Sequence, residues 1–345
     1  MTIENLLRDN IKSIKAYSSA RDEYQDASAK MAFLDANENP FTTAVNRYPD
    51  PQQSKVKEQL AEIKGIETSR ILLGNGSDEV LDLLFRAFCE PNVDNVITLP
   101  PTYGMYKVLA ALNAVELKEV LLDSNFQPKV EEIIAEQNNK SKLLFLCSPN
   151  NPTANSFDAD KIERLIKDFN GVVVIDEAYI DFSDQESWVS RLNEFPNLVI
   201  TQTLSKAYGL AGIRIGICYA SEYIISVLNK IKPPYNINQL SQDKAITRLS
   251  NLGKVKQEVN SILKERHRLL QQMDGISIIK KIYPSDANFI LVKVDDANKR
   301  YSQLIEQGIV VRNRTSQALC QNCLRFTVGT SSENDKLMSV LKNLN

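Results

Sequence analysis

The sequence predicts an α/β fold: a large domain with a mostly parallel sheet, covered by helices on both faces, and a smaller α+β C-terminal domain with an N-terminal arm. Between about residues 70 and 220, short apolar runs alternate with amphipathic segments, as in parallel strands buried on both faces. After about residue 250, one long charged helical segment precedes strand-like runs and polar loops. We expect an arm at residues 1–35, a large domain at 36–250 and a small domain at 251–345.

The composition argues against several classes of protein. The 345 residues include 41 lysines and arginines and 43 aspartates and glutamates, with no block of like charge. This balance disfavours nucleic acid or a membrane surface as the main partner. No apolar run approaches the roughly 20 residues of a membrane span, and the N-terminus lacks the pattern of a secretion signal. We therefore expect a cytoplasmic protein.

Metal-dependent and histidine-dependent chemistry are both disfavoured. The five cysteines are an odd number scattered along the chain, which is typical of free thiols in a reducing compartment. A zinc site at Cys320 and Cys323 would need two more ligands, and the single histidine, His267, lies in a separate charged helical segment. We predict no metal, and Ser-His-Asp or Cys-His catalysis would have to use His267.

The first elements are a polar arm and a region of turns. Residues 1 to about 30 are polar and weakly helical, so they are expected to form an arm and not a core element. Residues 34–51 contain three prolines and several Asn and Asp residues, which indicates turns and extended chain. Tyr17 and Tyr48 lie in this irregular context, where simple packing is the default role.

A strand at 71–73 then leads through two glycines into a helix that begins near Ser77. The free N–H groups and the positive dipole end of such a helix can hold a phosphate. Ser77 or Asp78 could equally serve only as a helix cap.

Four polar residues follow successive apolar runs in this part of the chain. They are Tyr103, Asn151, Asp176 and Lys206. The runs occupy residues 96–99, 143–147, 172–175 and 198–201. Ligands of parallel sheets bind beyond the carboxyl ends of the strands, so we expect these four side chains to converge on one site.

The pair Asp176 and Lys206 suggests the chemistry of that site. A buried carboxylate without a cation is costly, and Lys206 could supply the cation in a structural ion pair. Alternatively, a protonated pyridine nitrogen pairs with Asp176, and Lys206 is free to form a Schiff base with the aldehyde of the same ring. Asn151 and Tyr179 would then contact the ring and its phenolic oxygen, and Tyr103 would stack on it. The phosphate of such a cofactor would be held by Ser205, Arg214 and the helix start at Ser77.

The C-terminal part adds two arginines. Strand-like runs occupy residues 276–279, 288–292, 309–311 and 324–329. Arg312 and Arg325 flank a polar loop between the last two runs, and each could be an ordinary exposed arginine.

Several motifs together resemble a known family. Residues 148–153, 176–179 and 205–207, with Arg214, resemble the signature set of the aspartate-aminotransferase-like, fold type I pyridoxal phosphate enzymes. Further stretches, in order along the chain, resemble the histidinol-phosphate aminotransferase family; they are residues 34–40, 47–50, 86–91, 101–106, 284–289 and 323–329. The resemblance extends from about Tyr17 to Gly329.

The resemblance implies transfer of an amino group between L-histidinol phosphate and 2-oxoglutarate, giving imidazole acetol phosphate and L-glutamate, in histidine biosynthesis. It implies pyridoxal 5'-phosphate as cofactor and Lys206, Asp176 and Tyr179 as catalytic residues, with Lys206 moving the proton between substrate and cofactor. It further implies that Arg325 takes the carboxylate of glutamate and shares the substrate phosphate with Arg312.

The same resemblance implies a homodimer with a shared active site, in which Tyr48 reaches the cofactor phosphate of the neighbouring subunit. It adds Asp78 to the cofactor-binding residues, and Tyr17 and Asn37 to the substrate-binding ones.

The sequence departs from the family's pattern at two positions, and three other functions are alternatives to the one that the resemblance implies. Ala154 stands where the family usually has glycine, so the backbone of that turn would differ if a positive φ is required. Ser77 stands where many relatives have alanine, and a serine keeps the backbone donor. The alternatives are an aminotransferase for aromatic amino acids, a pyridoxal phosphate decarboxylase of a phosphorylated amino acid, and a non-catalytic binding protein of the same fold.

Overall fold

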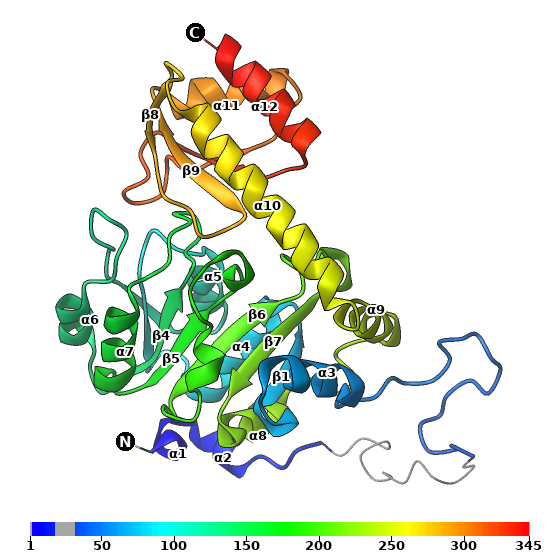
Figure 1. The fold of residues 1–345 in the computed structure, drawn as a ribbon. Coiled ribbons are helices and arrows are strands. Elements are labelled where there is room, and N and C mark those ends of the chain that lie inside the picture. Colours follow the sequence, from blue (N-terminus) through cyan, green and yellow to red (C-terminus); the bar gives the residue numbers. More distant parts are fainter. Residues whose placement is uncertain (1, 18–31, 345) are drawn as a thin grey trace.

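A seven-stranded sheet is the largest element of the computed structural model, which describes residues 2–17 and 32–344 (Figure 1). The strand order is β1-β7-β6-β5-β4-β2-β3. Only β7 runs antiparallel to its neighbours, β1 and β6, so the predicted mostly parallel sheet is confirmed. The strands are β1 (Ile71–Asn75), β2 (Asn95–Thr98), β3 (Glu116–Glu119), β4 (Ser141–Cys147), β5 (Val172–Asp176), β6 (Leu198–Thr203) and β7 (Ile215–Ala220).

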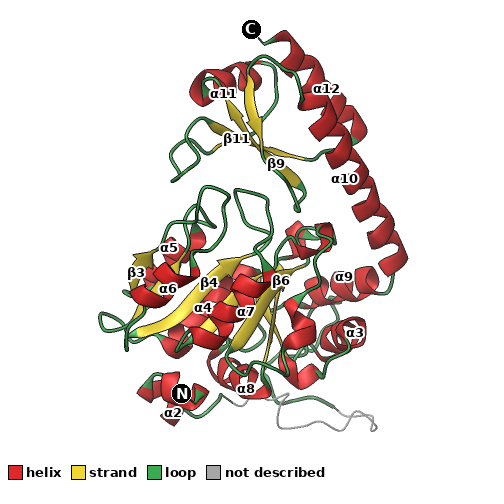
Figure 2. Ribbon diagram, turned by 60° about the vertical axis from the view of Figure 1, so that its left-hand side comes forward, coloured by secondary structure: helices red, strands yellow, loops and turns green. Residues whose placement is uncertain are grey.

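The strands are apolar throughout because both faces of the sheet are buried. Along β4, Leu144 and Leu146 point into one core, whereas Leu143 and Phe145 point into the other. Figure 2 shows the helices that cover the sheet. The first core is covered by α3 (Ser54–Lys64), α6 (Val130–Glu136), α7 (Ala159–Asp168) and α9 (Gln239–Leu249), and the second by α4 (Ser77–Phe88), α5 (Met105–Leu112) and α8 (Glu222–Ile231).

The N-terminal segment packs on the large sheet's helices. It forms two short helices, α1 (Ile3–Leu6) and α2 (Asp9–Ser13). Leu6 and Ile11 are buried in the same core as α4, and the backbone N–H of Arg8 donates to the carbonyl of Ala87. The expectation of an arm outside the core is thus wrong for residues 3–13, because a few apolar side chains suffice to anchor an otherwise polar segment.

A second, antiparallel sheet of four strands, in the order β10-β11-β9-β8, lies in the C-terminal part. Along β11, Leu324 and Phe326 point into a separate core with α11 and α12, whereas Cys323 belongs to the core of the large sheet. The small sheet therefore turns one face toward the large sheet. Its elements are β8 (Ile279–Ile282), β9 (Phe289–Val294), α11 (Ala297–Glu306), β10 (Arg312–Asn313), β11 (Cys323–Thr327) and α12 (Ser331–Asn343).

Helix α10 (Leu252–Met273) joins the two sheets. It passes from α9, beside the large sheet, to the small sheet, and is yellow in Figure 1. Its residues Val255 and Val259 are buried in the large core, whereas Leu269 and Met273 are buried in the small one. Among the helices of residues 2–17 and 32–344, none is long and apolar enough to cross a membrane.

Candidate active site

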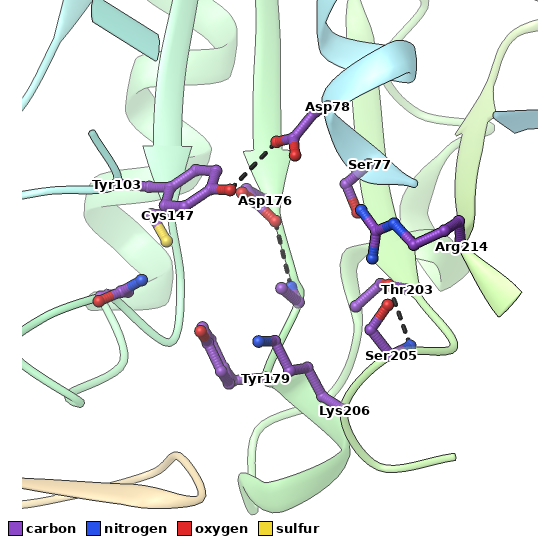
Figure 3. A pocket seen from close by; sticks show the side chains of 12 residues that line it. Ser77, Asp78, Tyr103, Cys147, Asp176, Tyr179, Thr203, Ser205, Lys206 and Arg214 are labelled. Atoms are coloured by element: carbon purple, nitrogen blue, oxygen red, sulfur yellow. Dashed lines mark hydrogen bonds between the residues drawn. The ribbon is translucent and has the colours of Figure 1, made fainter. Parts of the chain in front are cut away.

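A cleft lies where β4, β5 and β6 end (Figure 3). The structure brings together nine residues predicted from the sequence, namely Ser77, Asp78, Tyr103, Asn151, Asp176, Tyr179, Ser205, Lys206 and Arg214. The remaining lining residues are Cys147, Ala178 and Thr203. The convergence expected at the carboxyl ends of the strands is therefore observed.

Asp176 is a buried carboxylate without a cationic partner. It ends β5 and is 3% exposed. One oxygen accepts a hydrogen bond from the Tyr106 hydroxyl at 2.8 Å, and the other accepts one from the backbone N–H of Ala178 at 3.2 Å. Burial raises the pKa of Asp176. Within the described residues no lysine or arginine pairs with it, so the structural ion pair with Lys206 is not formed.

Lys206 follows β6 and points its amine into the cleft (Figure 3). Nζ lies 5.4 Å from the centre of the Tyr179 ring. The side chain is exposed because the cleft is open. Lost hydration around the amine nevertheless lowers the pKa of Lys206, and the positive charges of Arg325 and Arg214 lower it further. As a consequence, a larger share of the Lys206 amine is uncharged, and the uncharged form is the one that attacks carbonyls and accepts protons.

The start of α4 and the side chain of Arg214 form a positively charged corner of the cleft. Gly76 precedes α4, and no side chain caps the helix, so its first N–H groups remain available. A Cβ on Gly76 would lie 2.5 Å from an Arg214 nitrogen, and a Cβ on Gly216 would lie 2.3 Å from the Ser77 nitrogen. Both glycines are therefore needed to bring Arg214, β7 and the helix start together.

Tyr103 and Tyr106 each donate a hydrogen bond to a different carboxylate of the site. The Tyr103 hydroxyl donates to Asp78 at 3.1 Å, and the Tyr106 ring lies edge-on to Tyr103, with centroids 5.6 Å apart. Tyr106, which the sequence interpretation did not include among the site residues, holds Asp176. Its spacing of three residues from Tyr103, at the start of a helix, is the signal that could have identified it.

Asn151 connects the cleft to the small sheet. Its side-chain oxygen accepts a short hydrogen bond from Arg325, whose guanidinium also lies over the Phe289 ring, 4.9 Å from the centroid. This bond leaves the amide N–H group of Asn151 free to donate into the cleft. Arg325 does not line the cleft itself, but it is close enough for its charge to lower the pKa of Lys206.

The turn after Asn151 has the backbone that glycine would favour. Ala154 has a φ of 69°, in the left-handed region, and its side chain is fully buried. Its N–H donates to the Asn150 carbonyl at 2.8 Å, and its own carbonyl accepts from Asp286 of the small-sheet part at 2.7 Å. Alanine thus replaces the family's glycine without a change in the sign of φ.

Four predicted residues lie away from the cleft in the single chain. Tyr17 is 72% exposed and Arg312 is also exposed. Asn37 and Tyr48 line a second cavity with residues at the start of α9, and Tyr48 stacks on Tyr235 at 4.6 Å. Their predicted roles therefore stay predictions.

The cleft residues fit pyridoxal phosphate. Asp176 offers the uncompensated carboxylate that a cationic ring nitrogen requires. The uncapped helix start and Arg214 offer donors for a phosphate, and Lys206 offers an amine. No cluster of His, Cys, Asp and Glu suited to a metal ion occurs in the parts of the chain that the structure describes.

Comparisons with known proteins agree with this geometry. Residues 17–341 match the family model of aminotransferase class I and II. The chain is 63% identical over 344 residues to a histidinol-phosphate aminotransferase of Flavobacterium johnsoniae, covering 99% of both chains. It resembles the solved histidinol-phosphate aminotransferase of Clostridium acetobutylicum, with a TM-score of 0.80, 24% identity, and 87% and 90% of the two chains covered.

A further solved structure is that of histidinol-phosphate aminotransferase from Sinorhizobium meliloti in complex with pyridoxal-5'-phosphate, with a TM-score of 0.79 and 23% identity, covering 87% of this chain and 83% of that one. At such identities the structural likeness shows the fold alone. The family model covers nearly the whole chain and includes every residue that lines the cleft. The chain belongs to the aminotransferase class I and II family.

Proposed function

We propose that the chain transfers the amino group of L-histidinol phosphate to 2-oxoglutarate, giving imidazole acetol phosphate and L-glutamate, as a step of histidine biosynthesis. The observation that carries the reaction class is the unpaired carboxylate of Asp176 in one cleft with the amine of Lys206. The substrate is supported by the relatives at 51–63% identity, all named histidinol-phosphate aminotransferase.

The residues of the cleft divide the chemistry among them. When bound, pyridoxal phosphate supplies an aldehyde that combines with amines and a ring that withdraws electrons from the neighbouring carbon. Asp176 would stabilise positive charge on the ring nitrogen, and Tyr106 keeps the carboxylate oriented. The Nζ atom of Lys206, with its lowered pKa, would take the proton from the amine-bearing carbon of the donor.

The phosphate and the phenolic oxygen of the cofactor have separate sets of donors. Ser205, Arg214 and the N–H groups at Ser77 and Asp78 would hold the phosphate. The Asn151 amide nitrogen and the Tyr179 hydroxyl would donate to the phenolic oxygen, since Arg325 occupies the Asn151 carbonyl oxygen. Arg325 would bind the anion of the donor, a carboxylate or a phosphate.

We also propose a cytoplasmic homodimer in which Tyr48 completes the cofactor site of the neighbouring subunit. The support is the segment before α3, where Leu34, Phe41, Val45 and Tyr48 are 91%, 77%, 52% and 52% exposed. Apolar side chains gathered in one segment at such exposure are typical of an interface. A mixture of inactive Lys206→Ala and Tyr48→Ala chains should regain part of the activity, which a monomer with a self-contained site could not do.

An assay of the purified protein with different donors tests the substrate. We expect kcat/KM for L-histidinol phosphate with 2-oxoglutarate to exceed that for phenylalanine or tyrosine by about 100-fold or more, because a site built for a polar group rejects analogues that lack it. Comparable values would favour the aromatic aminotransferase. Release of carbon dioxide from a phosphorylated amino acid, without need of an oxo acid, would identify a decarboxylase.

A further inference from the structure

The face of the small sheet that turns toward the cleft carries three arginines. Arg312 and Arg325 are directly opposite each other in the antiparallel pair of β10 and β11. The N–H of Arg314 donates to the Cys323 carbonyl at 2.8 Å, which continues this pairing by two residues. Opposite residues, and residues two apart on a strand, share one face of a sheet. Arg314 therefore lies on the same face as Arg325.

Arg314 and Arg312 differ in their surroundings. Arg312 is exposed, whereas Arg314 is only partly exposed and its Nε is shielded from solvent without a hydrogen-bond partner. The Nε of Arg325 is in the same condition. Burial, followed by the nearby charge of Arg314, lowers the pKa of Arg325 to about 10. Neither Arg314 nor Arg325 pairs with a carboxylate in the described part of the chain.

This arrangement is unfavourable unless an anion is bound. Two like charges in close proximity repel, and a shielded donor that lacks an acceptor destabilises the protein by about 1–3 kcal/mol. The Phe289 ring and the Asn151 oxygen stabilise part of the Arg325 guanidinium, but the Nε–H groups of Arg314 and Arg325 have no acceptor among the described residues. A phosphate dianion has enough oxygens to accept from both guanidinium groups, whereas one carboxylate is satisfied by a single one.

We propose that Arg314 binds the phosphate of the amino donor together with Arg325 and is the residue by which this site favours a phosphorylated donor over glutamate. The inference rests on the function proposed above and adds a residue to it. In histidinol phosphate the phosphorus is three bonds from the amine-bearing carbon, whereas the α-carboxylate carbon of glutamate is attached directly to it. A phosphate therefore reaches past Arg325 toward a second guanidinium. Arg312, which the resemblance suggested for this role, is the more exposed of the two candidates.

The test compares donors on the holoenzyme with Arg314→Ala and Arg314→Lys. We expect kcat/KM for histidinol phosphate to fall by about 10- to 100-fold in Arg314→Ala, as for a lost charged hydrogen bond. The half-reaction with L-glutamate should change by less than about threefold. Competitive inhibition by inorganic phosphate should weaken in parallel. Arg314→Lys, which keeps the charge but not the two-pronged geometry, should lie between parent and Arg314→Ala.

Two further variants separate recognition from other effects. Lys256→Ala removes one positive charge from an exposed position of α10 and should leave the ratio between the donors unchanged. Arg312→Ala should reduce kcat/KM for histidinol phosphate less than Arg314→Ala does. Unfolding monitored by circular dichroism checks that each variant folds, and the ratio between donors is insensitive to a general loss of folded protein.

The outcomes are distinct. An equal loss for both donors in Arg314→Ala and Arg314→Lys, or no loss for histidinol phosphate, overturns the role of Arg314 and leaves the proposed function intact. A parent protein that does not use histidinol phosphate overturns the proposed function, and the inference with it.

Discussion

The carboxyl edge of the large sheet and the facing side of the small sheet hold their polar groups in different ways. At the large sheet, Asp176 is bonded to Tyr106, and Asp78 accepts from Tyr103. On the small sheet, Arg314 and Arg325 keep shielded donors that lack acceptors. The polar groups of the first region bond to one another, whereas the second region has donors that the proposed anion would satisfy.

This difference predicts two kinds of variant. Substitutions at the large sheet should reduce activity with every amino donor by the same factor, because they affect the chemistry that all donors share. Substitutions on the facing side of the small sheet should change the ratio between donors. Variants of the first kind can be compared directly with the Arg314 variants.

The largest effect is expected for Lys206→Ala. Removing the amine eliminates both the nucleophile and the proton carrier, so kcat should fall by at least about 10⁴-fold with histidinol phosphate and with glutamate alike. The absorption of the bound cofactor should also shift. Single-turnover kinetics with both donors measure this, and a variant that reacts at the parent rate would show that another base acts.

A loss of about 10²- to 4 × 10³-fold is expected for Asp176→Asn. An amide cannot stabilise a cationic ring nitrogen, and removal of one partner from a buried charge pair costs about 3–5 kcal/mol. Both donors should lose kcat/KM equally. Donor-dependent losses would contradict the division between the two regions.

Asp176→Asn should also change the thermal stability of the cofactor-free protein. Burial raises the folded-state pKa of Asp176, so the unfolded chain loses this proton at lower pH than the folded one. Stability therefore falls as the pH rises from the unfolded pKa of about 4 through the raised folded value. Asp176→Asn removes this loss. Thermal unfolding should give a higher Tm than the parent at pH 7 and a smaller difference near pH 4, and a lower Tm at pH 7 would refute the assignment.

A smaller loss is expected for Tyr106→Phe. The ring can keep its stacking on Phe145, at 4.8 Å between centroids, while the hydroxyl that orients Asp176 is removed. A hydrogen bond to a charged group is worth about 1.5–3 kcal/mol, so kcat/KM should fall by about 10- to 100-fold for both donors. Titration with the cofactor should show a matching loss of affinity, and unchanged affinity would exclude this orienting role.

The smallest effect is expected for Ala154→Gly, between the two regions. Relief of the left-handed backbone favours glycine by about 1–2 kcal/mol. The greater freedom of unfolded glycine costs about 0.5–1 kcal/mol, and the lost buried methyl group about 0.8 kcal/mol. Urea unfolding should therefore show a change within about 1 kcal/mol, with the ratio between donors unaltered. A change above about 2 kcal/mol would mean that the turn rearranges.

The cofactor side of the site could be predicted from the sequence because strand ends of a parallel sheet share one edge. Asn151, Asp176 and Lys206 each follow an apolar run, so the rule of strand ends brings them together without knowledge of distant contacts. Tyr106 was not predicted, since a tyrosine within a helix is usually a packing residue. Its hydroxyl reaches Asp176 only through the packing of α5 on the sheet.

The donor side was less predictable because it depends on how two sheets face each other. The sequence indicated Arg312 and Arg325 by resemblance, but not that Arg314 is the more shielded neighbour of Arg325. Strand register and the burial of a polar loop decide which arginine is shielded, and neither property can be read from a local sequence pattern. The division into domains at residues 35 and 250 stays a prediction, which limited proteolysis can test.

The hydrogen bond from Arg325 to Asn151 makes the binding of the two ligands interdependent. Asn151 lines the cleft proposed to hold the cofactor, and Arg325 is the residue proposed to bind the anion of the donor. An anion that pulls the Arg325 guanidinium away from Asn151 would weaken the hydrogen bond that holds the Asn151 amide in place. Thermodynamic linkage requires reciprocity: the factor by which histidinol phosphate alters cofactor affinity equals the factor by which the cofactor alters affinity for histidinol phosphate. One amide thereby couples retention of the cofactor to the supply of substrate.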